Sequence, residues 1–219
     1  MKKSTQRKRT TRFFIDAAVG IINEEGIDAI TIRKVADRAL YNSATLYNYF
    51  DNLDHLKSLA ALTFVSDYTE ALAEYVKEAK NTYEENLLVW ECFYKYSYEQ
   101  PSIFFSIFGK ALDKSFSNRM REFYELYPEM LEDVPHQIAG MLTKDNIYDR
   151  SMYLLEACAN DNYFNHSDLH DIDELLYFIY RGMMAKHMAD HAIYPTEEVF
   201  VNQAVLYLKR VFDSYRIDT

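Results

Sequence analysis

The stretch TIRKVADRALYNSATLYNYF, residues 31–50, holds two short helical patterns separated by a turn. Thr31 offers an N-cap hydroxyl to a helix that we expect over residues 32–39. Apolar residues repeat along one face of this helix, at Ile32, Val35, Ala36 and Ala39. Three basic residues are left for the solvent side, namely Arg33, Lys34 and Arg38. The first pattern therefore predicts a short helix with a basic outer face.

The second pattern begins at Asn42, a natural N-cap for a helix over residues 43–50. Leu46 and Phe50 are expected to point inward. The outward positions are Ser43, Ala44, Tyr47 and Asn48. Two short helices joined by a tight turn form a helix-turn-helix.

Small and hydrogen-bonding side chains suit a helix that enters the major groove of DNA. Tyr47 and Tyr49 combine a hydroxyl with a rigid ring, so they can reach phosphates at small entropic cost. Ser43, Ala44 and Asn48 are compact enough to approach base edges. The pattern favours a recognition helix, and its alternative is a helical corner that carries a surface aromatic cluster.

Upstream, residues 10–25 carry an apolar stripe typical of a helix, which Gly26 ends where a left-handed residue is favoured. Residues 1–57, the head, hold ten Lys/Arg against seven Asp/Glu, a net charge of +3. Residues 58–219, the body, hold the remaining fourteen against twenty-seven, a net charge of −13. This asymmetry indicates a head that faces a polyanion, and its alternative is a basic tail that only aids solubility.

These residues resemble the DNA-binding segment of TetR-family transcriptional regulators, above all in the run Thr45-Leu46-Tyr47-Asn48-Tyr49-Phe50 behind a capped basic helix. The resemblance covers about residues 10 to 57. It implies an all-helical homodimer with a ligand-binding C-terminal body, and double-stranded operator DNA and a small-molecule effector as partners. The DNA-binding residues it implies, together with those chosen from the helix pattern, are Arg33, Asn42, Ser43, Ala44, Thr45, Tyr47, Asn48, Tyr49 and Lys57.

Three positions depart from the family pattern. Leu40 stands where a turn glycine is usual, so we expect a turn that avoids a positive φ. Ala44 replaces a second common glycine, which is harmless inside a helix. Leu53 stands where a phosphate-binding lysine is usual, and Lys57, one turn later, is expected to replace it only weakly.

Composition predicts an all-α protein, because the 219 residues include only 5 Gly and 4 Pro and the apolar residues recur at three- and four-residue spacings. The longest apolar runs, such as residues 175–180, are far shorter than the roughly 18 residues that span a bilayer. With no signal-like segment after the basic start, we expect a cytoplasmic protein. Cys92 and Cys158 are expected to be buried, unpaired hydrophobic residues.

The organisation predicted is a helix-turn-helix domain over residues 1–57 and a ligand-binding and dimerisation domain over 58–219. A helix capped by Asp51 and running to about Lys80 is expected to join them. Beyond it, the pattern predicts helices over residues 83–99, 102–117, 119–131, 136–143, 148–162, 171–191 and 196–215.

The body holds 16 of the 19 tyrosines and 11 of the 14 phenylalanines. Tyrosine hydroxyls suit a polar-tipped cavity between helices better than a dry core, although core packing is the alternative for each ring. The predicted pocket residues are Tyr68, Tyr94, Tyr98, Phe104, Phe108 and Tyr127. The net charge of the body favours a cationic or neutral guest, unless one buried Arg or Lys overrules it.

The last two predicted helices carry wide apolar stripes that can pair with a second copy in a four-helix bundle. The alternative is burial within one chain. The predicted dimer residues are Leu175, Phe178, Gly182, Ala185, Ala189, Val201, Val205, Leu208 and Phe212.

Catalytic signatures are absent: the sequence holds no P-loop, no G-x-S-x-G and no H-E-x-x-H, so we expect no enzyme and no cofactor. Two histidine pairs with helical spacing, 187/191 and 166/170, are weak metal candidates. The alternative function is a helical small-molecule-binding protein whose DNA-binding head is degenerate.

Overall fold

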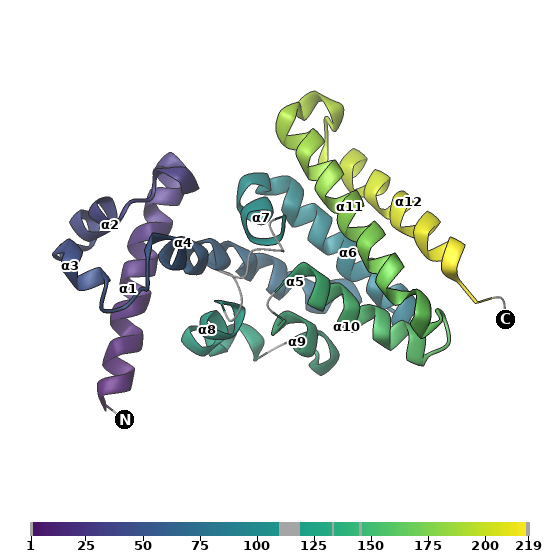
Figure 1. The fold of residues 1–219 in the computed structure, drawn as a ribbon, viewed down its shortest axis with the longest axis horizontal. Coiled ribbons are helices and arrows are strands. Elements are labelled where there is room, and N and C mark those ends of the chain that lie inside the picture. The colour runs from purple at the N-terminus through teal and green to yellow at the C-terminus, as the bar shows by residue number, and fades with distance from the viewer. Residues whose placement is uncertain (1, 110–118, 133, 145, 218–219) are drawn as a thin grey trace.

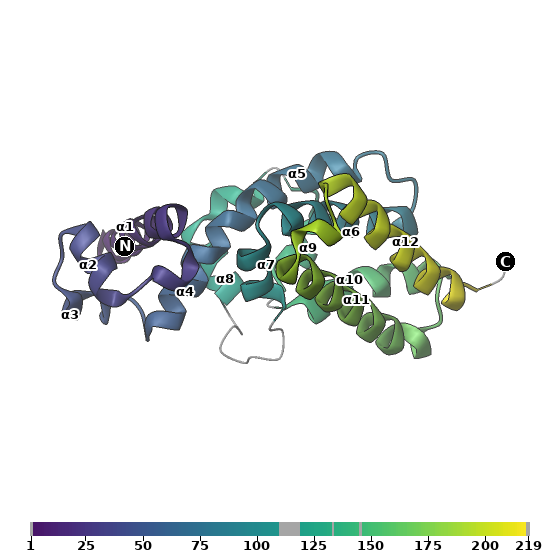
Figure 2. The ribbon, with the colours of Figure 1, turned by 90° about the horizontal axis from the view of Figure 1, so that it is seen from above.

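The computed structural model describes residues 2–109, 119–132, 134–144 and 146–217. These residues form helices and no strand, apart from one isolated bridge between Phe164 and Arg216. Figure 1 and Figure 2 both show the head at one end of an elongated molecule, with the body extending to the C-terminus at the other. The all-α prediction is therefore confirmed.

The head contains α1 (Lys2–Glu25), a 3₁₀ turn η1 (Ile27–Ala29), α2 (Ile32–Ala39) and α3 (Ser43–Leu46). Helix α1 packs on both α2 and α4, and its apolar stripe is buried at Phe14, Ala17, Ala18, Ile21 and Ile22. It begins at Lys2, eight residues before the predicted start. Gly26 follows it with φ 87°, a conformation that other residues rarely adopt.

The connecting helix is not continuous, which corrects the prediction for residues 51–80. It consists of α4 (Leu53–Leu62), a 3₁₀ turn η2 (Thr63–Val65) and α5 (Ser66–Val76). The Asn52 side chain caps α4 by accepting from His55 N at 2.8 Å, so the cap is not Asp51. At the tightened turn, Thr63 Oγ1 donates to Ala60 O and Ser66 Oγ donates to Thr63 O, both at 2.7 Å. Such hydroxyl bonds compete with the helical pattern and favour a tighter turn.

The remaining elements are α6 (Thr82–Glu99), α7 (Pro101–Phe108), α8 (Arg119–Leu126), η4 (Pro128–Leu131), α9 (His136–Leu142), α10 (Ile147–Asn160), η5 (His166–Asp168), α11 (Leu169–Ala189), η6 (His191–Ile193) and α12 (Glu197–Tyr215). Five of the predicted helices agree with α6, α9, α10, α11 and α12 to within two residues. The helix predicted over 119–131 instead ends at Leu126, before Pro128. Of the helix predicted over 102–117, α7 accounts for the part up to Phe108, and 110–117 lie outside the described residues.

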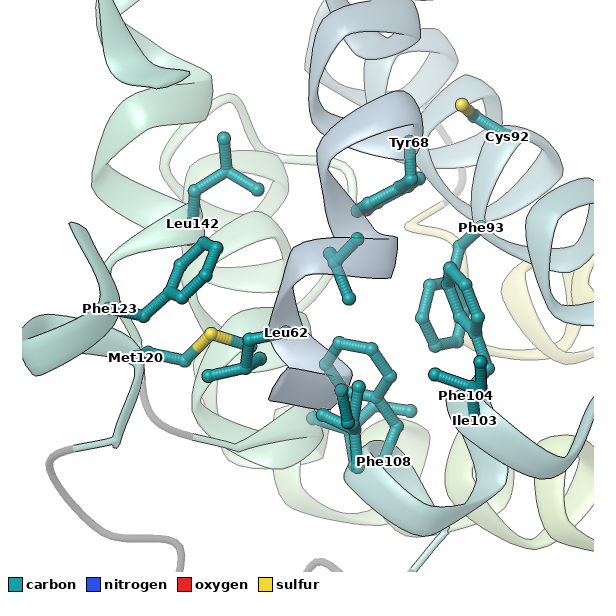
Figure 3. Packing of buried hydrophobic residues seen from close by; sticks show 14 of the residues in the cluster. Leu62, Tyr68, Cys92, Phe93, Ile103, Phe104, Phe108, Met120, Phe123 and Leu142 are labelled. Atoms are coloured by element: carbon teal, nitrogen blue, oxygen red, sulfur yellow. The ribbon is translucent and has the colours of Figure 1, made fainter. Parts of the chain in front are cut away.

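The body is a layered bundle in which α12 packs on α6, and α11 packs on both α10 and α12. Phe93 of α6 lies near its centre, with ring centroids 5.0 Å from Phe108 and Tyr180 and 5.8 Å from Phe104. Figure 3 shows Tyr68, Phe93 and Phe108 entering this core from three different helices. Helix α4 packs on α8, so the apolar core continues from the head into the body.

Candidate nucleic-acid interface and effector cavity

The predicted start of α2 is confirmed. The Thr31 side chain accepts a hydrogen bond from Lys34 N at 3.2 Å, and Val35, Ala36 and Ala39 are buried. Arg33 makes only a long, exposed ion pair, 3.8 Å from Asp37, with the two side chains 89% and 72% exposed, so it stays accessible to a partner.

The turn after α2 corrects a prediction. Leu40 adopts the left-handed conformation with φ 57° and ψ 39°, where a turn that avoids positive φ was expected. The helix end requires it, because Tyr41 N donates to Ala36 O at 2.9 Å in the manner of a Schellman cap. The Leu40 residue is 92% exposed, so no packing offsets a backbone strain of about 1 kcal/mol.

Helix α3 is a single turn, shorter than the predicted 43–50. The Asn42 side chain caps it by accepting from Ala44 N at 2.8 Å. Beyond Leu46 the chain continues as turns, with Phe50 N still bonded to Leu46 O at 3.0 Å. Leu46 and Phe50 are buried as predicted, and they anchor the segment to the head.

The predicted DNA-binding residues differ in their exposure. Tyr47 is 61% exposed, and Asn42, Ala44 and Asn48 are exposed with it. Tyr49 is partly buried, with its ring 5.4 Å from that of Phe14 and 5.4 Å from the Arg7 guanidinium. Three further members of the set are also partly buried, namely Ser43, Thr45 and Lys57. Arg7 thus places the basic start of α1 beside Tyr49.

Two cations of α2 are already paired. Lys34 Nζ lies 2.6 Å from Glu25, and Arg38 binds both carboxylate oxygens of Glu24 at 2.6 and 2.7 Å. The hydrogen bond from Arg38 is the main cause of a lowered pKa at Glu24. The outer face of α2 is therefore less basic than its sequence suggests.

The start of α1 also contacts the body, which the sequence did not indicate. Lys8 Nζ donates to Glu125 O at 2.7 Å, and Arg12 Nε donates to Leu126 O at 2.6 Å. The Arg12 guanidinium also pairs with Glu129 at 3.0 Å and lies 4.4 Å from the centre of the Tyr127 ring. Helix α1 is thereby fixed to the end of α8.

A buried histidine forms a second junction between head and body. Asp51 N donates to His55 Nδ1 at 3.1 Å, so Nε2 carries the proton that bonds Glu122 at 2.9 Å. Burial alone would raise the pKa of Glu122, but the bond from His55 and the charge of Arg119 lower it below its usual value. Helix α8 is thus held against both α1 and α4.

A small cavity lined mainly by buried residues lies in the body, between α5, α6, α7, α9 and α10. Its volume is about 30 Å³, enough for about one water molecule. The lining residues are Tyr68, Val89, Trp90, Phe93, Phe108, Met141, Ile147, Arg150, Ser151 and Leu154. Sequence reasoning missed eight of these, because their helical spacing is that of ordinary core residues.

Two predicted pocket residues, Tyr68 and Phe108, line this cavity, and four lie elsewhere. Phe104 packs on Phe93 and Phe108, and Tyr94 is buried among Trp90, Tyr180 and Phe200. Tyr98 stacks on His187 at 4.5 Å. Tyr127 lies beneath Arg12. These four rings serve packing in this arrangement, which was the alternative for each.

The predicted dimer residues divide between two environments. On α11 they are exposed, with Leu175 at 39%, Phe178 at 59% and the small residues Gly182, Ala185 and Ala189 beside them. On α12, in contrast, three of them face the chain's own core: Val201, Leu208 and Phe212 are buried, and Val205 is partly buried. The α12 half of the predicted surface is therefore corrected, because α12 packs on α6. The apolar residues that α12 does expose are Val199 and Leu206.

The part of the chain that the structure describes contains no three His, Cys, Asp or Glu side chains placed to hold a metal ion. None of its helices is long and apolar enough to cross a membrane. Cys92 and Cys158 are free and buried, as predicted.

The head matches a known family. Residues 14–56, which contain α2, the turn and α3, match the model of bacterial regulatory proteins of the tetR family. The head of this chain is therefore a tetR-family domain. Members of this family are transcription regulators and not enzymes. A comparison with curated protein sequences finds no match.

Solved structures share the fold of this chain over nearly its whole length. A putative TetR-family regulator from Mesorhizobium loti is 14% identical, with a TM-score of 0.59 over 96% of this chain and 98% of that one. SmeT, the repressor of the Stenotrophomonas maltophilia efflux pump SmeDEF, is 13% identical, with a TM-score of 0.53 over 95% and 91%. FadR from Bacillus subtilis, in complex with stearoyl-CoA, is 16% identical, with a TM-score of 0.53 over 92% and 97%. At these identities the likeness establishes the fold alone.

Proposed function

We propose that this chain is a ligand-responsive repressor that binds a palindromic operator as a homodimer. One observation carries the proposal: a capped, single-turn α3 presents exposed Ala44, Tyr47 and Asn48 while Leu46 and Phe50 fix its orientation. A segment built this way can place small and hydrogen-bonding groups in a major groove. Arg7 and Arg33 add positive charge on either side of it.

The dimer is proposed to form through the exposed face of α11. Leu175 and Phe178 are large apolar residues that water would otherwise cover, and Gly182 and Ala185 allow close approach of a second helix. Val199 and Leu206 of α12 extend this apolar surface, because α12 packs beside α11. A two-fold dimer would present two α3 segments to half-sites about 34–36 Å apart or a related multiple.

The effector is proposed to bind in the body and to act on the head through α4 and α8, in the cytoplasm where the DNA lies. SmeT has been solved with triclosan and FadR with stearoyl-CoA, so two proteins of this fold bind small molecules with apolar parts. The cavity beside α5 and α6 is a space that such a molecule could enlarge.

Selection from random duplexes at low salt tests DNA binding directly. We expect enrichment of one palindromic sequence, and failure to enrich any sequence would exclude the proposal. Tyr47→Ala should then weaken operator binding by about 1–3 kcal/mol if Tyr47 makes a base or phosphate contact. The matched variant Tyr47→Phe keeps the ring and isolates the part that depends on the hydroxyl.

Light scattering tests the dimer, with an expected mass of twice the 25.9 kDa of one chain. Ala185→Glu places a charge in the middle of the α11 face and should yield monomers with reduced operator affinity. Asn23→Glu adds the same charge at an exposed position of α1 and should leave the dimer intact. A single-chain mass for the unaltered protein at micromolar concentration would contradict the proposed interface.

A further inference from the structure

Among the described residues, Arg150 of α10 is the only Lys or Arg that lines this cavity, and it is 5% exposed. Its Nε donates to Lys144 O at 3.2 Å and its Nη2 donates to Leu142 O at 2.7 Å. Because α9 ends at Leu142, these two bonds satisfy carbonyls at a helix C-terminus. This structural role accounts for two of the three guanidinium nitrogens.

The third nitrogen, Nη1, is buried and has no hydrogen-bond partner. None of the ion pairs among the described residues includes Arg150, and the Phe108 ring lies 5.2 Å from the guanidinium carbon. A buried positive charge without an anionic partner is unfavourable, and an anion that reaches it would relieve that cost.

A second unpartnered donor borders the same cavity. The indole Nε1 of Trp90 is buried without a partner, and an indole N–H can only donate. The other walls are formed by Val89, Phe93, Phe108, Met141, Ile147 and Leu154, which are apolar or aromatic, and by Tyr68 and Ser151, whose hydroxyls can donate or accept. The cavity therefore offers donors to a group that only accepts, and apolar contacts to whatever carries that group.

We infer that the effector is an organic acid whose carboxylate binds Arg150 Nη1 and Trp90 Nε1 and whose apolar part packs against the aromatic walls. The regulatory role of this acid rests on the proposed function, but the binding site itself does not. The negative charge of the body acts over longer distances and does not outweigh a charge-assisted bond inside a low-dielectric cavity. The cationic or neutral guest expected from net charge is replaced by an anionic one.

The cavity as it stands holds about one water molecule, less than a carboxylate group needs, so an acid can bind only if the helices around it move apart. The liganded arrangement then differs from this one, which is the condition for a ligand to shift an equilibrium. Arg150 Nη2 also lies 3.3 Å from Met120 Sδ of α8. The same helix bonds His55 through Glu122 and Arg12 through Leu126 O, so a displaced guanidinium bears directly on the head junction.

The chain contains its own reporter for this site, because Trp90 is its single tryptophan. The full-length protein is titrated with benzoate, hexanoate and decanoate, each against its primary amide, while Trp90 fluorescence is recorded. We expect at least one acid to bind about tenfold to a hundredfold more tightly than its amide, the range typical of hydrogen bonds to a charged group. Equal affinities within every pair, or no response to any acid up to millimolar concentration, would overturn the inference.

Arg150→Gln should remove the preference for the acid, bringing the ratio of affinities to about one. Arg121→Gln, on the exposed surface of α8, removes the same charge and should leave the ratio unchanged. If Arg150→Gln does not fold, Arg150→Lys keeps the charge but shortens the donor, and the ratio should then fall between those two. An unchanged ratio in a folded Arg150 variant would also overturn the inference.

The titration needs no DNA, so the two proposals fail separately. Acid binding without any enriched operator would leave the cavity assignment standing and reject the repressor. An enriched operator with no acid binding would support the repressor and reject the cavity assignment. If the acid releases operator from the unaltered protein but not from the Arg150→Gln variant, the repressor and the acid site are both supported.

Discussion

Helix α8 contacts a buried basic side chain on each of two sides, His55 of the head and Arg150 of the body. At the head junction, both ring nitrogens of His55 are bonded, one to Asp51 N and one to Glu122. At the cavity, Arg150 contacts Met120 of α8 but leaves Nη1 without a partner. The body interior also buries Asp173 of α11, which takes part in none of the ion pairs of the described residues.

The difference suggests a division of work between the two regions. A fully bonded polar group fixes one geometry, because every alternative leaves it unsatisfied. A partly bonded group leaves free energy for a ligand to recover, at the expense of the unliganded state. The head junction is therefore expected to transmit movement as a rigid unit, and the body interior is where a ligand acts.

The largest expected effect is the pH dependence that Asp173 gives to the body. Burial raises its pKa to about 6, from 3.8. Because the folded state holds the proton more tightly than the unfolded state, its contribution to stability is full below about pH 4 and is lost as the pH rises to about 6. The loss amounts to about 3 kcal/mol at most. Asp173→Asn should remove this slope from urea unfolding curves recorded between pH 4 and 7.

Glu122, at the head junction, gives the pH dependence of stability the opposite sign. Its pKa is lowered, so its contribution is present above its ordinary pKa of 4.5 and is lost as the pH falls through the folded value. Glu122→Gln should therefore alter the unfolding curves only below about pH 4.5. If Asp173→Asn and the unaltered protein show the same profile between pH 4 and 7, the carboxylate of Asp173 is paired in solution and the comparison fails.

A pair of substitutions tests the comparison at α8 itself. His55→Phe removes a hydrogen bond to the half-buried Glu122, which keeps Arg119 at 3.4 Å, and leaves Asp51 N without its partner, so it should reduce the free energy of unfolding by about 1–3 kcal/mol. Arg150→Met removes an unpaired buried charge but also two bonds to α9 carbonyls, and the opposing effects should leave stability within about 1 kcal/mol. Urea unfolding measures both, and equal losses would show that Arg150 serves mainly to cap α9.

The sequence predicted those features that local chemistry determines. The predicted starts of α6, α10 and α12 agree to within one residue with the structure, where the side chains of Asn81, Asn146 and Thr196 cap these helices. The α2 cap and the inward positions Leu46 and Phe50 were also found. These signals lie within a few residues of the structure they specify.

The junction and the cavity depend instead on contacts between distant segments. Arg12 and Leu126 are 114 residues apart, and nothing in either local pattern links them. Arg150 lies in a helical stretch where a charged residue is normally placed on the solvent side, and only the end of α9 draws it inward. The exposed Leu40 shows a third limit, because the helix end imposes a backbone conformation that its side chain disfavours.

Leu40 gives a smaller expected effect, confined to the head. Leu40→Gly should raise the free energy of unfolding by about 1 kcal/mol, because glycine adopts positive φ without the clash of a side chain. Leu40→Ala keeps the clash and should bring no such gain. Since the residue makes no buried contact, the response to ligand should be unchanged. A loss of stability in Leu40→Gly would indicate that the turn adopts another conformation in solution.

The smallest change in stability is expected at the basic start of α1, where some cations lie near α3 of the head and one bonds to the body. Arg7 lies over Tyr49 beside α3 and Arg9 is exposed, whereas Lys8 donates to Glu125 O of the body. Replacing Arg7 or Arg9 by Gln should leave unfolding nearly unchanged. Each should lower the slope of log affinity for the operator against log salt by about one, as the loss of one phosphate contact requires.

Lys8→Gln removes the same charge one residue away, but its amine is bonded to the body, so the slope should hardly change. Operator titrations between 50 and 200 mM salt, roughly the range over which such contacts weaken, measure all three variants together. An equal fall in slope for Lys8→Gln would mean that α1 leaves α8 when DNA binds, and that the head junction is itself the moving part.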